Sequence, residues 1–101
     1  LNKDESFENI IAGKTGIDRI THFDPEGFAS QIAGEVKGFD PKTIMDPKEV
    51  KKADRFIQLG IHAAQEAMKD SGLVEDNKVS QDIADEFGIV SASGIGGLPN
   101  I

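Results

Sequence analysis

The stretch "DPKEVKKADRFIQLGIHAAQEAMKDSGL", residues 46–73, contains the strongest secondary-structure pattern in the chain. It opens with a helix start, because Asp46 can cap the helix, Pro47 suits the first helical position and Glu49 follows three residues after the cap. Gly72 supplies a stop. Between them, apolar or small residues recur at helical spacing: Val50, Ala53, Phe56, Ile57, Gly60, Ile61, Ala64, Ala67 and Met68.

This pattern predicts one continuous helix over residues 46–71. Such a helix would be about 39 Å long at a rise of about 1.5 Å per residue. A small domain is only about 30 Å across. We therefore expect the helix to need a larger body to pack on.

A second, shorter helix is predicted for "NKDESFENIIAG", residues 2–13. Its cap is either Asn2 or Asp4, and Gly13 marks its end. The acidic residues near its start suit the helix dipole. Its apolar face has i, i+3, i+4 spacing and consists of Phe7, Ile10 and Ile11.

Strand patterns in the rest of the chain are weaker. Residues 14–28 predict a loop, and "QIAGEVKGFDP", residues 31–41, predicts a short edge strand. Residues 74–87 predict a polar loop with a short helical turn, and an apolar run near 87–92 predicts a buried strand. A buried strand needs hydrogen-bonded neighbours on both sides. The chain offers only one other candidate strand, so a complete sheet is not expected from it alone.

Composition narrows the classes of function. The chain has 101 residues and a formal net charge of -7, which repels phosphate backbones and anionic lipid. We therefore expect neither nucleic acid nor a membrane as partner. Cysteine is absent, which excludes a disulfide, a thiolate metal site and a cysteine nucleophile within these residues. The first residue is Leu1, and we expect the natural N-terminus to lie elsewhere.

A glycine-rich loop, "SGIGGLP", spans residues 93–99. Pro99 stands where a dinucleotide fingerprint requires its third glycine, and no Lys-Ser or Lys-Thr pair follows as in a P-loop. Two interpretations stay open on the residues alone. The loop is either a simple turn or a segment that brings backbone close to a ligand.

Four basic residues crowd into eight positions of an otherwise acidic chain: Lys48, Lys51, Lys52 and Arg55. On the predicted helix their spacing puts them on one face. Cations near a helix N-terminus are mildly unfavourable. The cluster is therefore either an ordinary solvated face or a docking site for an acidic partner.

The two histidines do not form a recognisable site. His62 and Glu66 lie four residues apart on the predicted helix, but no third or fourth metal ligand is evident near them. His22, in "THFD", is predicted to be a loop residue. We predict no metal, and we can assemble no catalytic set from these residues.

The order of these pieces resembles the N-terminal quarter of the β-ketoacyl-acyl-carrier-protein synthase II family. The resemblance rests on "SFENIIAGKTGIDRITHFD", "IAGEVKGFDP", the helical stretch at 46–73 and "GIVSASGIGGL". It implies an α/β class, as part of a thiolase-like fold of layered helices and sheets built from two similar halves. Residues 1–101 would then be a partial N-terminal domain, and we expect no complete independent domain.

The family resemblance also implies a function. These cytoplasmic homodimers load an acyl chain onto a cysteine, decarboxylate malonyl-carrier-protein and condense the two in fatty-acid elongation. The resemblance places that cysteine and two catalytic histidines beyond the end of this chain, and His22 and His62 do not match them. We therefore expect no catalytic residue here, no cofactor and no activity of the chain alone.

Two candidate sites follow from the resemblance. The acyl-pocket loop corresponds to Ser93, Gly94, Ile95, Gly96 and Gly97, with Ile95 at the bottom of the pocket. The docking helix for the acidic acyl carrier protein corresponds to Lys48, Lys51, Lys52 and Arg55, of which Lys48 and Lys52 match best. Two alternatives remain: a non-catalytic acidic helical binding module, and a condensing-enzyme relative that has lost its catalytic residues.

Overall fold

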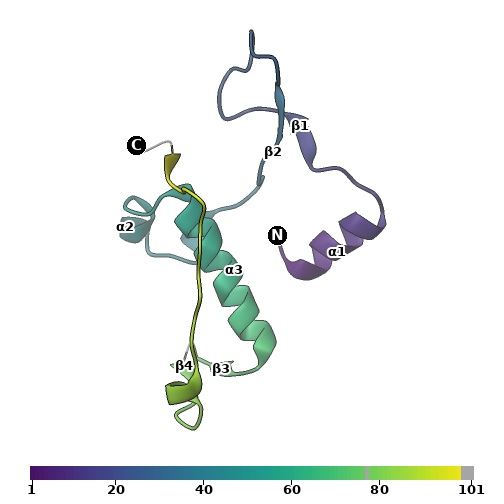
Figure 1. The fold of residues 1–101 in the computed structure, drawn as a ribbon. Helices are drawn as coiled ribbons and strands as arrows, with labels where there is room; N and C mark the ends of the chain where they lie inside the picture. The colour runs from purple at the N-terminus through teal and green to yellow at the C-terminus, as the bar shows by residue number, and fades with distance from the viewer. Residues whose placement is uncertain (77, 99–101) are drawn as a thin grey trace. The chain divides into compact units, whose positions relative to one another are not determined.

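The computed structural model describes residues 1–76 and 78–98 (Figure 1). The chain divides into two compact units, which we describe separately. The first unit comprises Leu1–Phe39, and the second begins at Asp40. Both units mix helices with short antiparallel strands.

The first unit begins with helix α1, Lys3–Ile11, as the sequence predicted. The structure decides the cap, because the Asn2 side chain accepts a hydrogen bond from the Glu5 N–H at 2.8 Å. The helix stops at Gly13, whose φ of 71° is favourable only for glycine. Its predicted apolar face is not covered within the unit, and Phe7 and Ile10 are 63% and 73% exposed.

Two short strands follow, β1 (Ile17–Arg19) and β2 (Ile32–Gly34), paired antiparallel with Asp18 opposite Ala33 (Figure 1). The predicted edge strand at 31–41 is confirmed at β2. The prediction of a loop over 14–28 was wrong at β1. A strand of three residues is too short for its periodicity to be recognised, and β1 exists because β2 pairs with it.

The second unit contains α2 (Pro47–Val50) and α3 (Arg55–Ser71), preceded by a 3₁₀ turn η1 (Pro41–Thr43). The predicted start at Asp46 is confirmed, because its carboxylate accepts a hydrogen bond from the Lys48 N–H at 2.8 Å. The predicted stop at Gly72 is also confirmed, with a left-handed φ of 72°.

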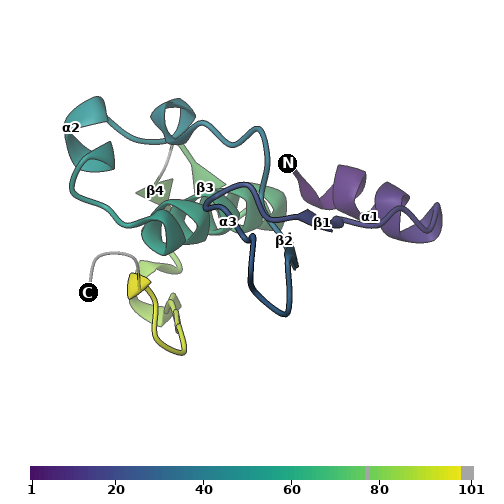
Figure 2. The ribbon, with the colours of Figure 1, turned by 90° about the horizontal axis from the view of Figure 1, so that it is seen from above.

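The single helix predicted over 46–71 was wrong, because the chain leaves the helical path between α2 and α3 (Figure 2). Asp54 is extended, and the N–H of Ile57 bonds to the Asp54 carbonyl. The helix bonds to the carbonyls of Val50 and Ala53 are therefore not made. The Gln58 side-chain amide donates to both carbonyls instead, at 3.2 Å and 3.0 Å. These two hydrogen bonds replace the missing helix bonds, because a buried carbonyl needs a hydrogen-bond partner.

The chain continues from α3 into a small hairpin of β3 (Val74–Glu75) and β4 (Lys78–Val79), followed by a 3₁₀ turn η2 (Ala84–Glu86). The predicted helical turn within 74–87 is confirmed at η2. The hairpin was not predicted, since two-residue strands leave no periodic pattern.

The strand predicted near 87–92 was wrong. In the second unit this segment is assigned to neither helix nor strand, and it pairs with no described strand. Ile89 is 71% exposed and Val90 fully exposed. The apolar run is present, but a strand also requires a neighbour to bond with, and neither β3 nor β4 serves as one.

Among the described residues, no aliphatic or aromatic side chain is fully covered. Gln58 is a buried polar residue, at 8% exposure. On α3, Phe56 and Ile57 are about two-fifths exposed, at 40% and 39%. The apolar faces predicted from periodicity are therefore present, but neither unit covers them.

Candidate functional site

The four basic residues lie in one continuous segment, which we name the basic segment: Lys48, Lys51, Lys52 and Arg55. All four are exposed. The prediction that they share one helical face was wrong, because the helix is broken between them. Lys48 lies on α2, Lys51 and Lys52 lie in the turn, and Arg55 begins α3.

The three lysines of the basic segment make no ion pair with any carboxylate in the described part of the chain. Their ammonium groups are therefore solvated and available to another molecule. Exposed charges of this kind contribute little to folding but raise the rate at which an oppositely charged partner associates.

The glycine-rich loop makes a tight turn at Gly96 and Gly97, whose φ values are 65° and 55°. A Cβ added at Gly96 would come within 2.7 Å of the Phe56 ring, and one added at Gly97 would strike the Asp54 carboxylate. The backbone thus passes so close to the start of α3 that only glycine fits at these two positions.

A shallow groove of about 390 Å³ lies where this turn meets α3. Arg55, Phe56 and Leu59 form its helical side. Asp54, Gly96, Gly97 and Leu98 complete the lining. The structure therefore brings one residue of the basic segment, Arg55, to the same groove as two of the predicted acyl-pocket residues.

The other predicted site residues do not line this groove. Ser93, Gly94 and Ile95 are exposed, and Ile95 is 78% exposed. Lys48, Lys51 and Lys52 also lie outside its lining.

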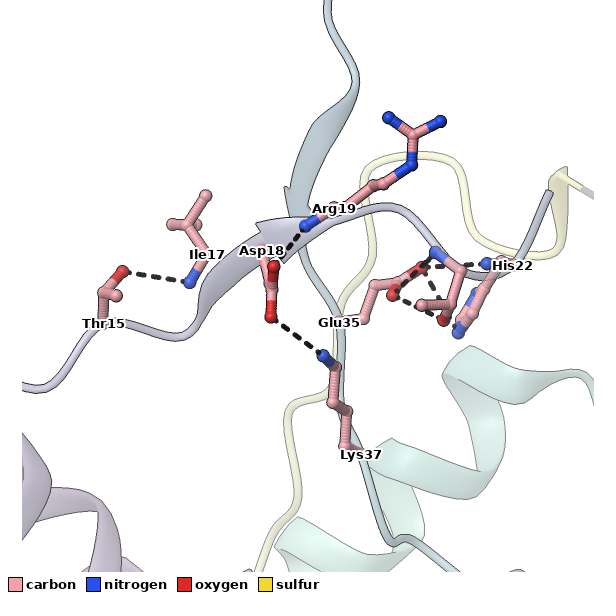
Figure 3. Close-up of polar contacts among 8 residues, drawn as sticks. Thr15, Ile17, Asp18, Arg19, His22, Glu35 and Lys37 are labelled. Carbon is pink, nitrogen blue, oxygen red and sulfur yellow. Dashed lines mark hydrogen bonds and ion pairs between the residues drawn. The ribbon is translucent and has the colours of Figure 1, made fainter. Parts of the chain in front are cut away.

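A polar cluster that sequence analysis missed holds the connection between β1 and β2 (Figure 3). The Glu35 carboxylate accepts hydrogen bonds from the Thr21 hydroxyl at 2.9 Å, the Thr21 N–H at 3.1 Å and the His22 N–H at 3.2 Å. The His22 imidazole also lies near this carboxylate, with its Nε2 3.7 Å from Oε2 of Glu35. The Glu35 side chain is only 8% exposed. One feature of the sequence could have indicated that Glu35 is buried. In "IAGEV" it stands two residues after Ala33 and therefore on the same side of the strand.

These contacts change the acidity of Glu35. Burial is the largest effect and raises the pKa of its carboxyl. The hydrogen bonds from Thr21 and His22, with the attraction of the His22 ring, together outweigh burial and lower the pKa below its ordinary value. The cluster therefore favours a charged carboxylate, which ties residues 21 and 22 to the end of β2.

The histidines lie where the sequence placed them, His22 in the loop after β1 and His62 on α3. Across residues 1–76 and 78–98, no group of three or more potential ligands is arranged to hold a metal ion. In the same residues, no helix has the length and apolar character required to cross a lipid bilayer.

Comparison with known proteins decides the family. The family described as "Beta-ketoacyl synthase, N-terminal domain" matches residues 1–100. This chain belongs to the β-ketoacyl synthase family. The resemblance noted in the sequence and the predicted α/β class are thereby confirmed.

Several curated relatives of this synthase-family chain share one name, 3-oxoacyl-[acyl-carrier-protein] synthase 2. The protein of Vibrio cholerae is 43% identical over 95 residues, and that of Coxiella burnetii is 39% identical over 95 residues. Both matches cover 94% of this chain and 22% of the relative. A Staphylococcus aureus protein is 41% identical over 92% of this chain, again covering 22% of the relative. The chain therefore spans about a fifth of the length of these relatives.

Proposed function

We propose that residues 1–101 are the N-terminal part of a 3-oxoacyl-acyl-carrier-protein synthase that elongates fatty acids. The observation that carries this proposal is the shared name of relatives about 40% identical over 92–94% of the chain. The exposed apolar faces of α1 and α3 support it, because a segment of a larger fold presents such faces to the rest of its domain.

The proposed reaction is a decarboxylative condensation. An acyl group forms a thioester with an enzyme cysteine, and malonyl-carrier-protein loses carbon dioxide to give a carbanion equivalent. That carbon attacks the thioester carbonyl, a carbon–carbon bond forms, and the cysteine leaves as thiolate. The 101 residues contain no cysteine, so their proposed share is binding and positioning.

The proposed acyl-pocket loop is Ser93–Gly97. Two glycines with left-handed φ let the backbone approach α3 closely, and Ile95 supplies one branched apolar side chain just before them. An apolar side chain on a loop without other bulky groups suits the end of a pocket that receives an alkyl chain.

The proposed docking surface for the acyl carrier protein is the basic segment. Its lysines are exposed and make no ion pair within the described residues, so an acidic partner would not have to displace existing partners. We further propose a cytoplasmic homodimer that requires no cofactor, as the family resemblance implies.

The test is a condensation assay on the full-length protein that contains this chain. Incubation with acyl-carrier-protein and malonyl-carrier-protein should release carbon dioxide and form 3-oxoacyl-carrier-protein. Carrier binding without product would instead identify a relative that has lost its catalytic residues. Failure to bind the carrier at all would overturn the proposal, and a cooperative melt of the isolated residues would favour an independent module.

A further inference from the structure

The glycine-rich turn lies against two side chains at the start of α3, those of Asp54 and Phe56. The Phe56 ring lies so close to Gly96 that an added Cβ would be 2.7 Å from two ring carbons. The Asp54 carboxylate lies in the same way against Gly97, and the Phe56 ring also reaches to 3.4 Å from a Cβ added there. The turn is therefore bounded by two side chains that neither the basic segment nor the glycine-rich loop includes.

The glycines cannot fix this turn by themselves. Glycine visits left-handed and right-handed φ with similar ease, so two adjacent glycines allow many loop paths. In the structure, the φ values of Gly96 and Gly97 are 65° and 55°. The Phe56 ring and the Asp54 carboxylate restrict these paths by occupying the volume next to the two glycines.

Ile95 immediately precedes the restricted turn, so the direction of its side chain depends on the backbone of Gly96. Phe56 is 40% exposed, so its ring is only partly enclosed by the described residues. A shift of the ring would therefore change the paths open to Gly96 and move Ile95 with them.

We infer that Phe56 and Asp54 are positioning residues that set acyl-chain selectivity by holding the Gly96–Gly97 turn and, through it, Ile95. This inference rests on the proposed function. It also links the two proposed surfaces, because Arg55 of the basic segment lies between these two residues in the sequence and lines the same groove.

The test compares acyl substrates in the full-length protein. The measured quantity is the ratio of kcat/KM for a long-chain to a short-chain acyl substrate. Phe56→Leu should change this ratio by about tenfold, the lower end of the range over which one methylene in an apolar pocket acts. Lys52→Glu should raise KM for the carrier equally for both substrates and leave the ratio unchanged.

A double-mutant cycle separates positioning from general damage to the fold. Gly96→Ala adds a methyl group that collides with the Phe56 ring, and Phe56→Leu removes that ring. The two changes should therefore be non-additive in the ratio. Gly88→Ala is the matched control, because a Cβ there meets nothing within 4 Å and the φ is not left-handed, so its ratio should equal the wild-type value.

A second measurement does not depend on activity. In the isotope-labelled protein, Phe56→Leu should shift the amide resonances of Gly96 and Gly97, whereas Phe87→Leu, in the same unit but outside the lining of the groove, should not. An unchanged selectivity ratio with additive effects in the cycle would overturn the inference, as would unshifted glycine resonances. If the unmutated protein catalyses no condensation but the shifts are still observed, the proposed function is wrong, while the contact between Phe56 and the turn is supported.

Discussion

The side-chain amide of Gln58 donates a hydrogen bond to the backbone carbonyl of Val50 at 3.2 Å, across the break between α2 and α3. The same amide donates to the Ala53 carbonyl at 3.0 Å. One side chain thus satisfies two carbonyls that the break leaves without helical partners. The Gln58 side chain also fixes where α3 begins, and hence the positions of Asp54 and Phe56 next to the glycine-rich turn.

Replacing Gln58 with Ala should destabilise this junction. Two carbonyls would lose their partner in a site where Gln58 is 8% exposed, which costs about 1–3 kcal/mol for an unsatisfied buried group. Amide hydrogen exchange in the full-length protein should be faster around residues 50–58. The control is Gln65→Ala, since Gln65 is exposed and its bond to the Ile44 carbonyl is long, at 3.5 Å. Equal effects of the two variants would contradict this account.

Two glycines of the α3 region should respond to alanine in opposite directions. Gly60 lies inside the helix, and an added Cβ meets nothing within 4 Å among the described residues, so Gly60→Ala should stabilise the helix in the isolated residues 1–101 by about 0.5–1 kcal/mol. Gly72 ends the helix with a φ of 72°, so Gly72→Ala should destabilise it by about 1–2 kcal/mol. Hydrogen-exchange protection along α3 measures both, and a stabilising Gly72→Ala would show that the left-handed end is absent.

Local chemistry predicted the end of α1, the start of α2 and the end of α3. Asp46, Gly13 and Gly72 act through side chains or φ values that depend on a few neighbouring residues, and all three lie where the sequence places them. For the cap of α1 the sequence left Asn2 and Asp4 open, and the structure has Asn2. The apolar periodicity of the long stretch was also real, and it continues through α3.

The features that sequence analysis missed depend on contacts between separate residues. The helix break depends on Gln58 reaching back to Val50 and Ala53, and a glutamine in a helical pattern gives no sign of this. The apolar run near 87–92 lacks a described strand to pair with. In the candidate site, the loop and the basic segment were proposed separately. Only the three-dimensional structure shows that Arg55 and Gly96 line the same groove.

The Glu35 cluster should make the β1–β2 connection sensitive to acid. The pKa of Glu35 is lowered in the folded protein, so the unfolded chain binds more protons in the window between the two values. The stabilisation is therefore complete above its ordinary value of 4.5 and is lost as pH falls through the lowered folded value. Hydrogen exchange at the Thr21 and His22 amides, corrected for intrinsic rates, should show protection disappearing in that range.

Glu35→Gln should remove this pH dependence, because an amide has no proton to gain in acid. The matched control is Glu26→Gln, which loses only a long contact of 3.7 Å to Arg19 and should keep the wild-type dependence. If the Glu35→Gln protein still lost protection at the same pH, another group would be responsible.

Carrier docking at the basic segment can be tested by measuring KM for the carrier protein in a charge-reversal variant of the full-length protein. Lys48→Glu together with Lys52→Glu should raise this KM about tenfold at low salt, because two exposed attractions become repulsions, and added salt should reduce the difference. Lys14→Glu with Lys78→Glu makes the same change in net charge outside the basic segment and should leave KM near the wild-type value. An unchanged KM in the Lys48/Lys52 variant, or an equal rise in both variants, would contradict a carrier-docking role for the basic segment.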